Sequence, residues 1–358
     1  MKVLIVKTSS LGDVIHTLPA LTDAVGAVPG IRFDWVVEEA YAEIPVWHPA
    51  VDNAIPVALR RWRTRPLDAS CWRMWSAFKA RVHHAGYDAV IDAQGLLKSA
   101  WITRYARGMI FGFDRRSARE PLAAWFYDAP RFVPRGQHAV ERVRQLFAGA
   151  LGYEDRAAVL ARYSQGDYGL VLPEAPDGIL PRAGSDPGAR RPGKVVFLHG
   201  TTWPTKHWPE RAWIALSRQF AQAGLQVILP WGSEPERLRA ERIADASGGE
   251  VPDRMNLTAL VRLMAGAAGC VSVDTGLGHL AAAVNTPTVS LFGPTNPELT
   301  GFYGKNQRIL CSGFPCAPCL RKNCSHSGGR VGEAPCFGDL SADSVFDTFM
   351  ALMEDVGR

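Results

Sequence analysis

The chain has 358 residues, about twice the length of a typical single domain, so its length favours two domains. Its composition, 47% hydrophobic and 21% charged, is that of a folded globular protein and excludes a mainly disordered chain. The formal charge of +5 is only mildly basic. The apolar stretch at the start is too short for a signal peptide, and no run of about 18 apolar residues follows, so we expect a cytoplasmic protein.

The basic residues are unevenly spread and gather in the N-terminal half. One cluster comprises Arg60, Arg61, Arg63 and Arg65, and a second comprises Arg115, Arg116 and Arg119. Such clusters predict an anionic partner, which could be an acidic glycolipid, a membrane surface or a nucleic acid.

The predicted elements alternate between strands and helices in both halves of the chain. In the first half, strands are predicted at 3–6, 33–37 and 89–91, and one helix carries Val14, Ile15, Leu18, Leu21 and Val25 on a single stripe. In the second half, strands at 195–198, 227–229, 271–273 and 288–292 alternate with helices at 211–223, 257–264 and 278–284. This alternation is typical of parallel α/β sheets.

Domain boundaries are predicted from a stretch that lacks hydrophobic periodicity. Residues 173–193 are rich in Pro and Gly and are predicted to form a linker. They would separate a Rossmann-like domain at 1–172 from a second at 194–340, and a closing amphipathic helix is predicted at 341–358. Polar turns follow the strands, and such turns are where an open α/β sheet binds ligands.

The first turn with residues suited to chemistry is the segment 7–13, Lys-Thr-Ser-Ser-Leu-Gly-Asp. Gly12 permits a tight bend, and Asp13 lies at the start of the helix that follows. One interpretation is that Asp13 merely caps this helix. Because Ser10 and the Gly12 turn offer the same cap, the alternative is a carboxylate left free for an incoming ligand.

Two further turns are suited to a diphosphate. The segment 199–208 combines hydroxyls, backbone NH groups and Lys206 after a buried strand, although a plain loop with a solvated lysine is the alternative. It lacks the spacing of a Walker A loop. The segment 273–281 contains G-x-G-x-x-A, which alone is weak evidence for a dinucleotide, since the acidic residue expected after the next strand is missing.

Five of the seven cysteines fall within 26 residues, namely Cys311, Cys316, Cys319, Cys324 and Cys336. The last four could hold a structural Zn²⁺, although their spacing is not that of a standard finger. The alternative is a set of reduced thiols that stiffen a loop rich in Pro and Gly.

Together these segments resemble the bacterial lipopolysaccharide heptosyltransferases of glycosyltransferase family 9, in particular members that act on Kdo-lipid A. The resemblance spans nearly the whole chain and rests on residues 6–16, 200–208 and 274–279. It implies a GT-B fold, in which two Rossmann-like domains face each other across a cleft. It also implies transfer of L-glycero-D-manno-heptose from ADP-heptose to Kdo of Kdo2-lipid A, with inversion and without a catalytic metal or other cofactor. A lipid acceptor implies a peripheral position on the cytoplasmic face of the inner membrane.

The same resemblance assigns roles to individual residues. Asp13 is expected to be the general base, Lys206 to stabilise the departing diphosphate, Glu234 to hold the ribose and Met255 to lie near the adenine. The full donor set is Thr201, Thr202, Lys206, Glu234, Met255, Asp274, Thr275, Gly276 and His279, and the acceptor set is Ser10, Arg60, Arg61, Arg63 and Arg119.

The chemistry of an inverting displacement agrees with these residue types. It needs a base on the acceptor and a positive charge at the leaving group. The sequence contains no Asp-x-Asp pair to hold a divalent ion, so Lys206 and a helix N-terminus would carry that charge. The arginines suit the carboxylate of Kdo and the phosphates of lipid A.

Three alternatives stay open at this point. The nearest is a family member whose acceptor already bears a heptose, although the Thr8-Ser9-Ser10 start and the arginines at 60–65 favour Kdo. A nucleic-acid-binding protein with a zinc module is disfavoured, because the cysteines and arginines are far apart and no known nucleic-acid motif is present. A nicotinamide oxidoreductase would need the missing acidic residue.

Overall fold

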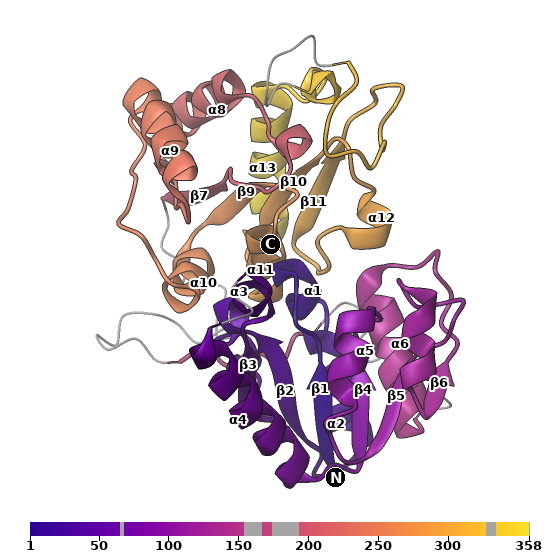
Figure 1. The fold of residues 1–358 in the computed structure, drawn as a ribbon. Helices are drawn as coiled ribbons and strands as arrows, with labels where there is room; N and C mark the ends of the chain where they lie inside the picture. The colour runs from indigo at the N-terminus through magenta and orange to yellow at the C-terminus, as the bar shows by residue number, and fades with distance from the viewer. Residues whose placement is uncertain (65–67, 154–166, 174–192, 327–333, 358) are drawn as a thin grey trace. The chain divides into compact units, whose positions relative to one another are not determined.

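The computed structural model divides into two compact units, Met1–Val171 and Leu172–Arg358 (Figure 1). The structure describes residues 1–64, 68–153, 167–173, 193–326 and 334–357, without the side chains of Arg60 and Arg63. The predicted linker at 173–193 therefore lies almost wholly outside the described residues. Within the described part, no helix is both long and apolar enough to span a lipid bilayer.

The N-terminal unit contains a six-stranded sheet in the order β3-β2-β1-β4-β5-β6. Its strands are β1 (Lys2–Val6), β2 (Arg32–Glu38), β3 (Val51–Val57), β4 (Ala89–Asp92), β5 (Met109–Phe113) and β6 (Ala129–Arg131). Every neighbouring pair is parallel, as the strand and helix alternation predicts. The central strand β1 is apolar along almost its whole length, because helices cover both faces of a parallel sheet.

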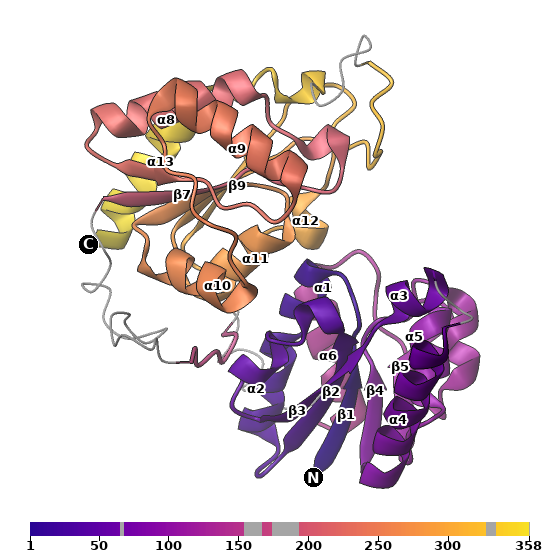
Figure 2. The same cartoon turned by 60° about the vertical axis from the view of Figure 1, so that its left-hand side comes forward.

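Two helical layers cover this sheet. The α-helices are α1 (Leu11–Ile15), α2 (Leu18–Ala27), α3 (Leu59–Thr64), α4 (Ala69–Ala85), α5 (Leu97–Thr103) and α6 (Ala139–Leu151), and the 3-10 turns are η1 (Glu39–Tyr41), η2 (Pro45–Trp47) and η3 (Pro121–Phe126). Helices α2 and α6 pack together. Apolar side chains of α3, α4, α5 and η3 share one core with the sheet. Figure 2 shows α2 to the left of β1 and β2, and α4 and α5 to the right.

The segment after β1 differs from the prediction of one continuous helix. The structure has two helices, α1 and α2, interrupted at His16 and Thr17. Pro19 lies in the first turn of α2, where a residue without a backbone NH is tolerated but cannot continue the hydrogen bonds of α1. Val25, expected on the buried stripe, is exposed as a result.

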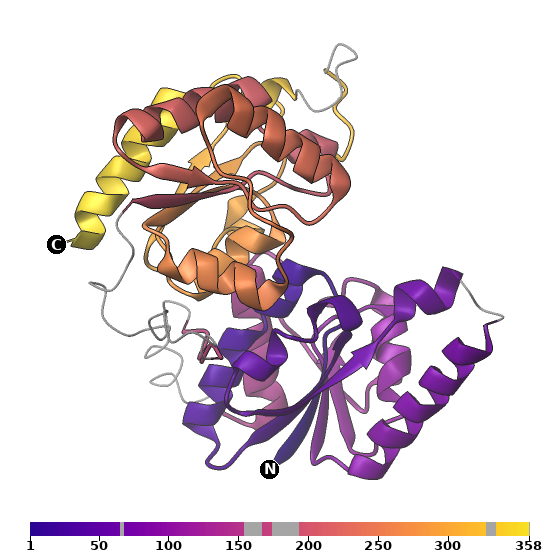
Figure 3. The same ribbon diagram turned by 90° about the vertical axis from the view of Figure 1, so that its left-hand side faces the viewer.

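The C-terminal unit contains a five-stranded sheet in the order β11-β10-β9-β7-β8. Its strands are β7 (Lys194–Leu198), β8 (Gln226–Ile228), β9 (Gly269–Val273), β10 (Thr288–Phe292) and β11 (Gln307–Cys311), again paired in parallel. Its helices are α8 (Glu210–Gln222), α9 (Glu234–Ser247), α10 (Leu257–Gly266), α11 (Gly276–Ala283), α12 (Pro297–Thr300) and α13 (Ala342–Gly357), with short turns η5 (Pro204–Lys206) and η6 (Pro335–Phe337). Helices α8, α9 and α13 share one core with the sheet. Figure 3 shows them on one face of it, with α13 in yellow.

Candidate functional site

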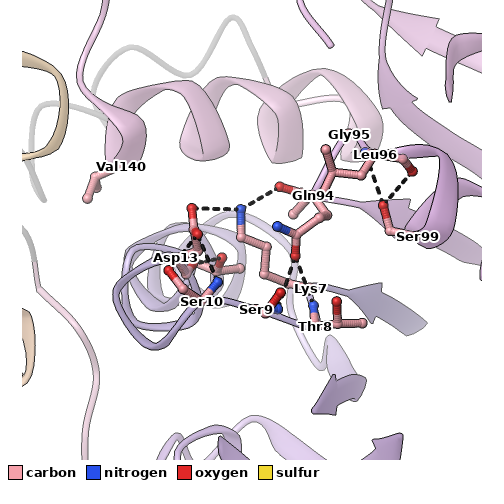
Figure 4. A network of polar contacts seen from close by, with 12 residues as sticks. Lys7, Thr8, Ser9, Ser10, Asp13, Gln94, Gly95, Leu96, Ser99 and Val140 are labelled. Carbon is pink, nitrogen blue, oxygen red and sulfur yellow. Dashed lines mark hydrogen bonds and ion pairs between the residues drawn. The ribbon is translucent and has the colours of Figure 1, made fainter. Parts of the chain in front are cut away.

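The carboxyl end of β1 holds a buried lysine paired with an aspartate (Figure 4). Lys7 Nζ lies 3.7 Å from an Asp13 carboxylate oxygen and donates a hydrogen bond to the Ala93 carbonyl at 2.8 Å. The Lys7 side chain is 7% exposed, whereas that of Asp13 is 31% exposed. The carboxylate is therefore the member of the pair that solvent or a ligand can reach.

The same carboxylate caps helix α1. Asp13 Oδ2 accepts hydrogen bonds from the Ser10 backbone nitrogen at 2.8 Å and from Ser10 Oγ at 2.9 Å. The expectation that Ser10 and the Gly12 turn would leave the carboxylate free is therefore wrong. Asp13 is the third residue of the helix, a position from which a side chain reaches back to the NH group before the first turn. Its second oxygen, Oδ1, faces Lys7.

The charges around Asp13 set its protonation. Burial alone would raise its pKa, but Lys7 and the hydrogen bonds from Ser10 outweigh burial and hold the pKa of Asp13 below its ordinary value. Burial lowers the pKa of Lys7, against the opposing effect of Asp13 and Asp92. Arg119 lowers the pKa of both members of the pair, which places its charge near them. Asp13 is thus ionised at neutral pH and able to accept a proton.

A second loop, after β4, holds the backbone of this segment in place. The Gln94 side-chain oxygen accepts hydrogen bonds from the backbone nitrogens of Thr8 at 3.1 Å and Ser9 at 3.2 Å. Gln94 is itself held by buried Asp92, which accepts from the Gln94 backbone nitrogen and from Ser99 Oγ, both at 2.8 Å. Sequence reasoning missed Gln94, although the available signal was a polar turn directly after β4, like the one after β1.

The predicted acceptor residues have different surroundings. Ser10 donates a hydrogen bond to Asp13, and the positive charge of exposed Arg119 lowers the pKa of Asp13. Arg61 forms an ion pair with Glu39 at 3.0 Å, and both side chains are exposed. The side chains of Arg60 and Arg63 lie outside the described residues. Among the described side chains, the structure therefore brings one of the five predicted residues, Ser10, into contact with the Asp13 carboxylate.

In the C-terminal unit, the loops after β7, β9 and β10 converge on one ion pair. Lys206 Nζ lies 2.6 Å from Asp274 Oδ2, and the same oxygen accepts a hydrogen bond from Thr295 Oγ1 at 2.6 Å. Thr201 Oγ1 donates to the Asp274 carbonyl at 3.1 Å. The Lys206 ammonium also lies 4.6 Å from the centre of the Trp203 ring. Thr201, Lys206 and Asp274 were predicted from sequence to lie together, whereas Thr295 and the role of Trp203 were missed.

Helix α11 begins directly beside this ion pair. Thr275 is its N-cap residue and Gly276 its first residue, so the start of the helix offers backbone NH groups to an anion next to the ammonium. Buried His279 packs edge to face against Phe302, with ring centres 4.8 Å apart. A Cβ atom on Gly278 would lie 1.9 Å from the Phe302 ring, so packing explains the second glycine of G-x-G without a dinucleotide.

Other predicted donor residues lie in neighbouring loops of the same sheet. Glu234 is the first residue of α9, after β8, and its exposed carboxylate is bonded to Arg237 at 2.5 Å. Met255 is half-buried in the loop before α10, and Thr202 is exposed in the loop after β7. Loops that follow the strands of a parallel sheet lie at one edge of it, which is where an open α/β sheet binds a nucleotide.

The predicted zinc site gains no support from the geometry. Cys316, Cys319 and Cys324 line a cavity of about 410 Å³, together with His326. Burial and the three neighbouring thiols raise the pKa of Cys336 to about 11. Nowhere in residues 1–64, 68–153, 167–173, 193–326 and 334–357 do three Cys, His, Asp or Glu side chains take positions that would hold a metal ion. The zinc site therefore stays a prediction.

Comparisons with known proteins agree on one family. A family model described as glycosyltransferase family 9 (heptosyltransferase) matches residues 75–328. Lipopolysaccharide heptosyltransferase 1 of Pseudomonas aeruginosa is 56% identical over 328 residues, which are 91% of this chain and 88% of that protein.

Solved structures agree with the sequence relatives. E. coli heptosyltransferase WaaC with ADP matches with a TM-score of 0.82 and 44% identity, covering 98% of this chain and 100% of that one. E. coli heptosyltransferase WaaC with ADP-2-deoxy-2-fluoro heptose matches with a TM-score of 0.77 and 42% identity, covering 98% and 99%. The GT-B fold class predicted from the sequence is confirmed by these matches and by the two parallel sheets. A cleft between the two domains stays a prediction.

We expect Lys7→Met to raise the pKa of Asp13. The substitution removes the nearest positive charge but leaves the burial that opposes ionisation. The measurement is a pH titration of the Asp13 carboxyl carbon by NMR. Lys2→Met is the matched control, because it removes a lysine that pairs with Asp34 at 3.2 Å. An Asp13 titration that is the same in wild type and Lys7→Met would contradict the assigned role of Lys7.

Proposed function

The chain belongs to glycosyltransferase family 9, the heptosyltransferases, and on this basis we propose that it transfers L-glycero-D-manno-heptose from ADP-heptose to a Kdo residue of Kdo2-lipid A. This is the reaction of a lipopolysaccharide heptosyltransferase I, and the alternative is heptosyltransferase II. The observation that carries the choice is 56% identity, over nine tenths of the chain, to a protein named lipopolysaccharide heptosyltransferase 1. The reaction proceeds by single displacement with inversion and needs neither a catalytic metal nor another cofactor.

The donor diphosphate binds where α11 begins. Lys206 and the backbone NH groups at Thr275 and Gly276 face it and neutralise the charge that develops as the sugar leaves. Asp274 and Trp203 support this role, because they hold the flexible lysine side chain in one place. The remaining donor contacts come from Thr201, Thr202 and His279 near the phosphates, Glu234 at the ribose and Met255 at the adenine.

The acceptor hydroxyl binds at Asp13. The carboxylate is ionised, partly exposed and fixed by Lys7 and Ser10, which suits a general base. Arg119 brings a positive charge close to it, and Arg60, Arg61 and Arg63 form a second basic group for the carboxylate of Kdo and the phosphates of lipid A. Since the acceptor is anchored in lipid, the enzyme works as a peripheral protein on the cytoplasmic face of the inner membrane. The reaction involves no nucleic acid.

The choice of donor is tested by titration calorimetry in excess EDTA with ADP-heptose, GDP-mannose, UDP-glucose and NAD. We expect ADP-heptose to bind most tightly and Mg²⁺ to change neither binding nor turnover, because Lys206 and α11 supply the positive charge. Lys206→Ala should weaken ADP-heptose binding, while Lys194→Ala, at the far end of β7, should not. Preference for NAD, or turnover that is restored only by Mg²⁺, would refute this donor site. A higher kcat/KM for an acceptor that already bears heptose would instead indicate heptosyltransferase II.

We expect Asp13→Asn to keep the fold and the donor affinity but to lower kcat by a factor of about 10² to 10⁴, the usual contribution of a general base. The amide oxygen can still accept the hydrogen bonds from Ser10, so helix α1 keeps its cap. If Asp13 only caps the helix, the result reverses: turnover stays near normal and stability falls, by about 1 kcal/mol or less from the cap together with the cost of leaving buried Lys7 without its ion pair. Thermal melts and initial rates on one sample distinguish the two outcomes.

We expect Arg119→Ala to raise the acceptor KM about tenfold or more and to leave the Kd of ADP-heptose unchanged. A lost charge-assisted hydrogen bond costs about 1.5 to 3 kcal/mol. Rates can be measured at neutral pH, because Lys7 and Ser10 contribute more than Arg119 to the lowered pKa of Asp13, so the carboxylate stays ionised in the variant. Arg218→Ala, on α8 in the other unit, is the control. An unchanged acceptor KM would show that Arg119 does not touch the acceptor.

A further inference from the structure

One face of the N-terminal unit exposes large apolar side chains that no part of the proposed reaction uses. They belong to α4, α5 and η3, and they are Trp72, Met74, Leu97, Trp101, Leu122 and Trp125. Trp72 is 63% exposed and Trp125 is 68% exposed. Single exposed apolar residues are ordinary, but several on neighbouring elements mark an interaction surface.

These residues lie on one continuous layer. Helices α3, α4, α5 and η3 pack their inner sides into the same core. Trp75 of α4 stacks on Trp101 of α5, with ring centres 5.1 Å apart and nearly parallel planes. Trp72 lies one turn before Trp75 on α4, and α5 packs against η3. The exposed aromatic side chains therefore form the outer side of a single layer, which Figure 2 shows beyond the strands at α4 and α5.

The charge of this layer is mostly positive. The sequences of α3, α4, α5 and η3 contain no Asp or Glu. Their described cations include Arg73, Arg81 and Lys98, all exposed, of which Arg81 donates a hydrogen bond to Asn53 at 3.3 Å and Lys98 to Ser9 at 3.4 Å. Three acidic residues at the margins are engaged: Glu39 pairs with Arg61, Glu120 accepts a hydrogen bond from the Leu97 backbone at 2.6 Å, and Asp68 caps α4 by accepting from the Ser70 backbone at 2.8 Å.

Aromatic rings and cations also alternate on this layer. The Arg115 guanidinium lies 5.6 Å from the centre of the exposed Trp125 ring, and Lys79 Nζ lies 5.7 Å from that of Tyr105. Tryptophan prefers the boundary between lipid headgroups and acyl chains, and each lysine or arginine near an anionic bilayer gains from its negative surface potential. This combination fits a lipid surface better than it fits a protein, whose charges are mixed.

We propose that the α3–α4–α5–η3 layer docks on an anionic phospholipid bilayer, with Trp72, Trp101 and Trp125 inserted at the headgroup level. This inference rests on the proposed function in one respect: an acceptor anchored in lipid is the reason why the enzyme would bind a membrane. The contacts themselves are with ordinary phospholipid, so they do not require the acceptor.

The test is flotation of the full chain with vesicles that contain no glycolipid. We expect binding to vesicles of equal parts phosphatidylglycerol and phosphatidylethanolamine, weak binding to phosphatidylcholine alone, and loss of binding at high salt. The double variant Trp72→Ser/Trp125→Ser should bind about tenfold more weakly or worse. Leu238→Ser removes another apolar residue, 45% exposed, from α9 of the other unit and should bind like wild type.

Arg73→Glu tests the charge independently of the aromatic rings and should also weaken binding. The proposal would be overturned if wild type, the double variant and Arg73→Glu all bound vesicles equally. It would also be overturned if the substitutions left vesicle binding unchanged and instead abolished self-association of the protein. Transfer to a deacylated, soluble acceptor should be unchanged in the variants. Wild type that binds vesicles but transfers no heptose would overturn the proposed function and leave this docking surface intact, so the two failures are distinguishable.

Discussion

Each unit of this protein places one lysine and one aspartate, in contact, at the carboxyl end of a central parallel strand. The two pairs are exposed in opposite senses. In the N-terminal unit the aspartate is the more exposed partner: the side chain of Asp13 is 31% exposed and that of Lys7 is 7% exposed. In the C-terminal unit the lysine is the more exposed partner: the side chain of Lys206 is 16% exposed and that of Asp274 is 8% exposed. A buried charge is tolerated only when it is paired, so each hidden partner has a clear purpose. Lys7 keeps a carboxylate ionised, and Asp274 keeps an ammonium in position.

The parallel sheet is what allows these pairs to form. Lys206 and Asp274 follow β7 and β9, which are neighbours in the sheet but 68 positions apart in the chain. Thr295 comes to the same carboxylate from β10, the next strand along. In the N-terminal unit, β1 and β4 are likewise neighbours, and Gln94 after β4 fixes the backbone after β1. Residues far apart in sequence thus act on one group because their strands end at one edge.

This arrangement also explains which features could be predicted from the sequence. Period and turn chemistry were sufficient for two parallel α/β domains, whereas the GT-B fold class came from the resemblance to a family. Two motifs indicated Thr201, Lys206 and Asp274. Thr295 was missed because its function depends on the order of the strands, which no local pattern encodes. The break between α1 and α2 was missed because the apolar stripe continues through it, although Pro19 was the available signal. Arg61 was expected to be free for a ligand, but its partner Glu39 lies on another element, 22 residues earlier.

The protonation of Asp13 bears on how the proposed reaction divides its work between the two units. A carboxylate with a pKa below the ordinary value is ionised at neutral pH, but it is a weak base. In the proposed reaction it therefore takes the acceptor proton late along the reaction coordinate. Most of the barrier must then be lowered where the diphosphate leaves, by Lys206 and the start of α11. That demand explains why three loops and an aromatic ring hold Lys206, whereas Asp13 needs only its own turn, one lysine and the loop after β4. Lys7 and Arg119 lower the pKa of Asp13 and so weaken it as a base, but in the proposed reaction the same positive charges would attract an anionic acceptor.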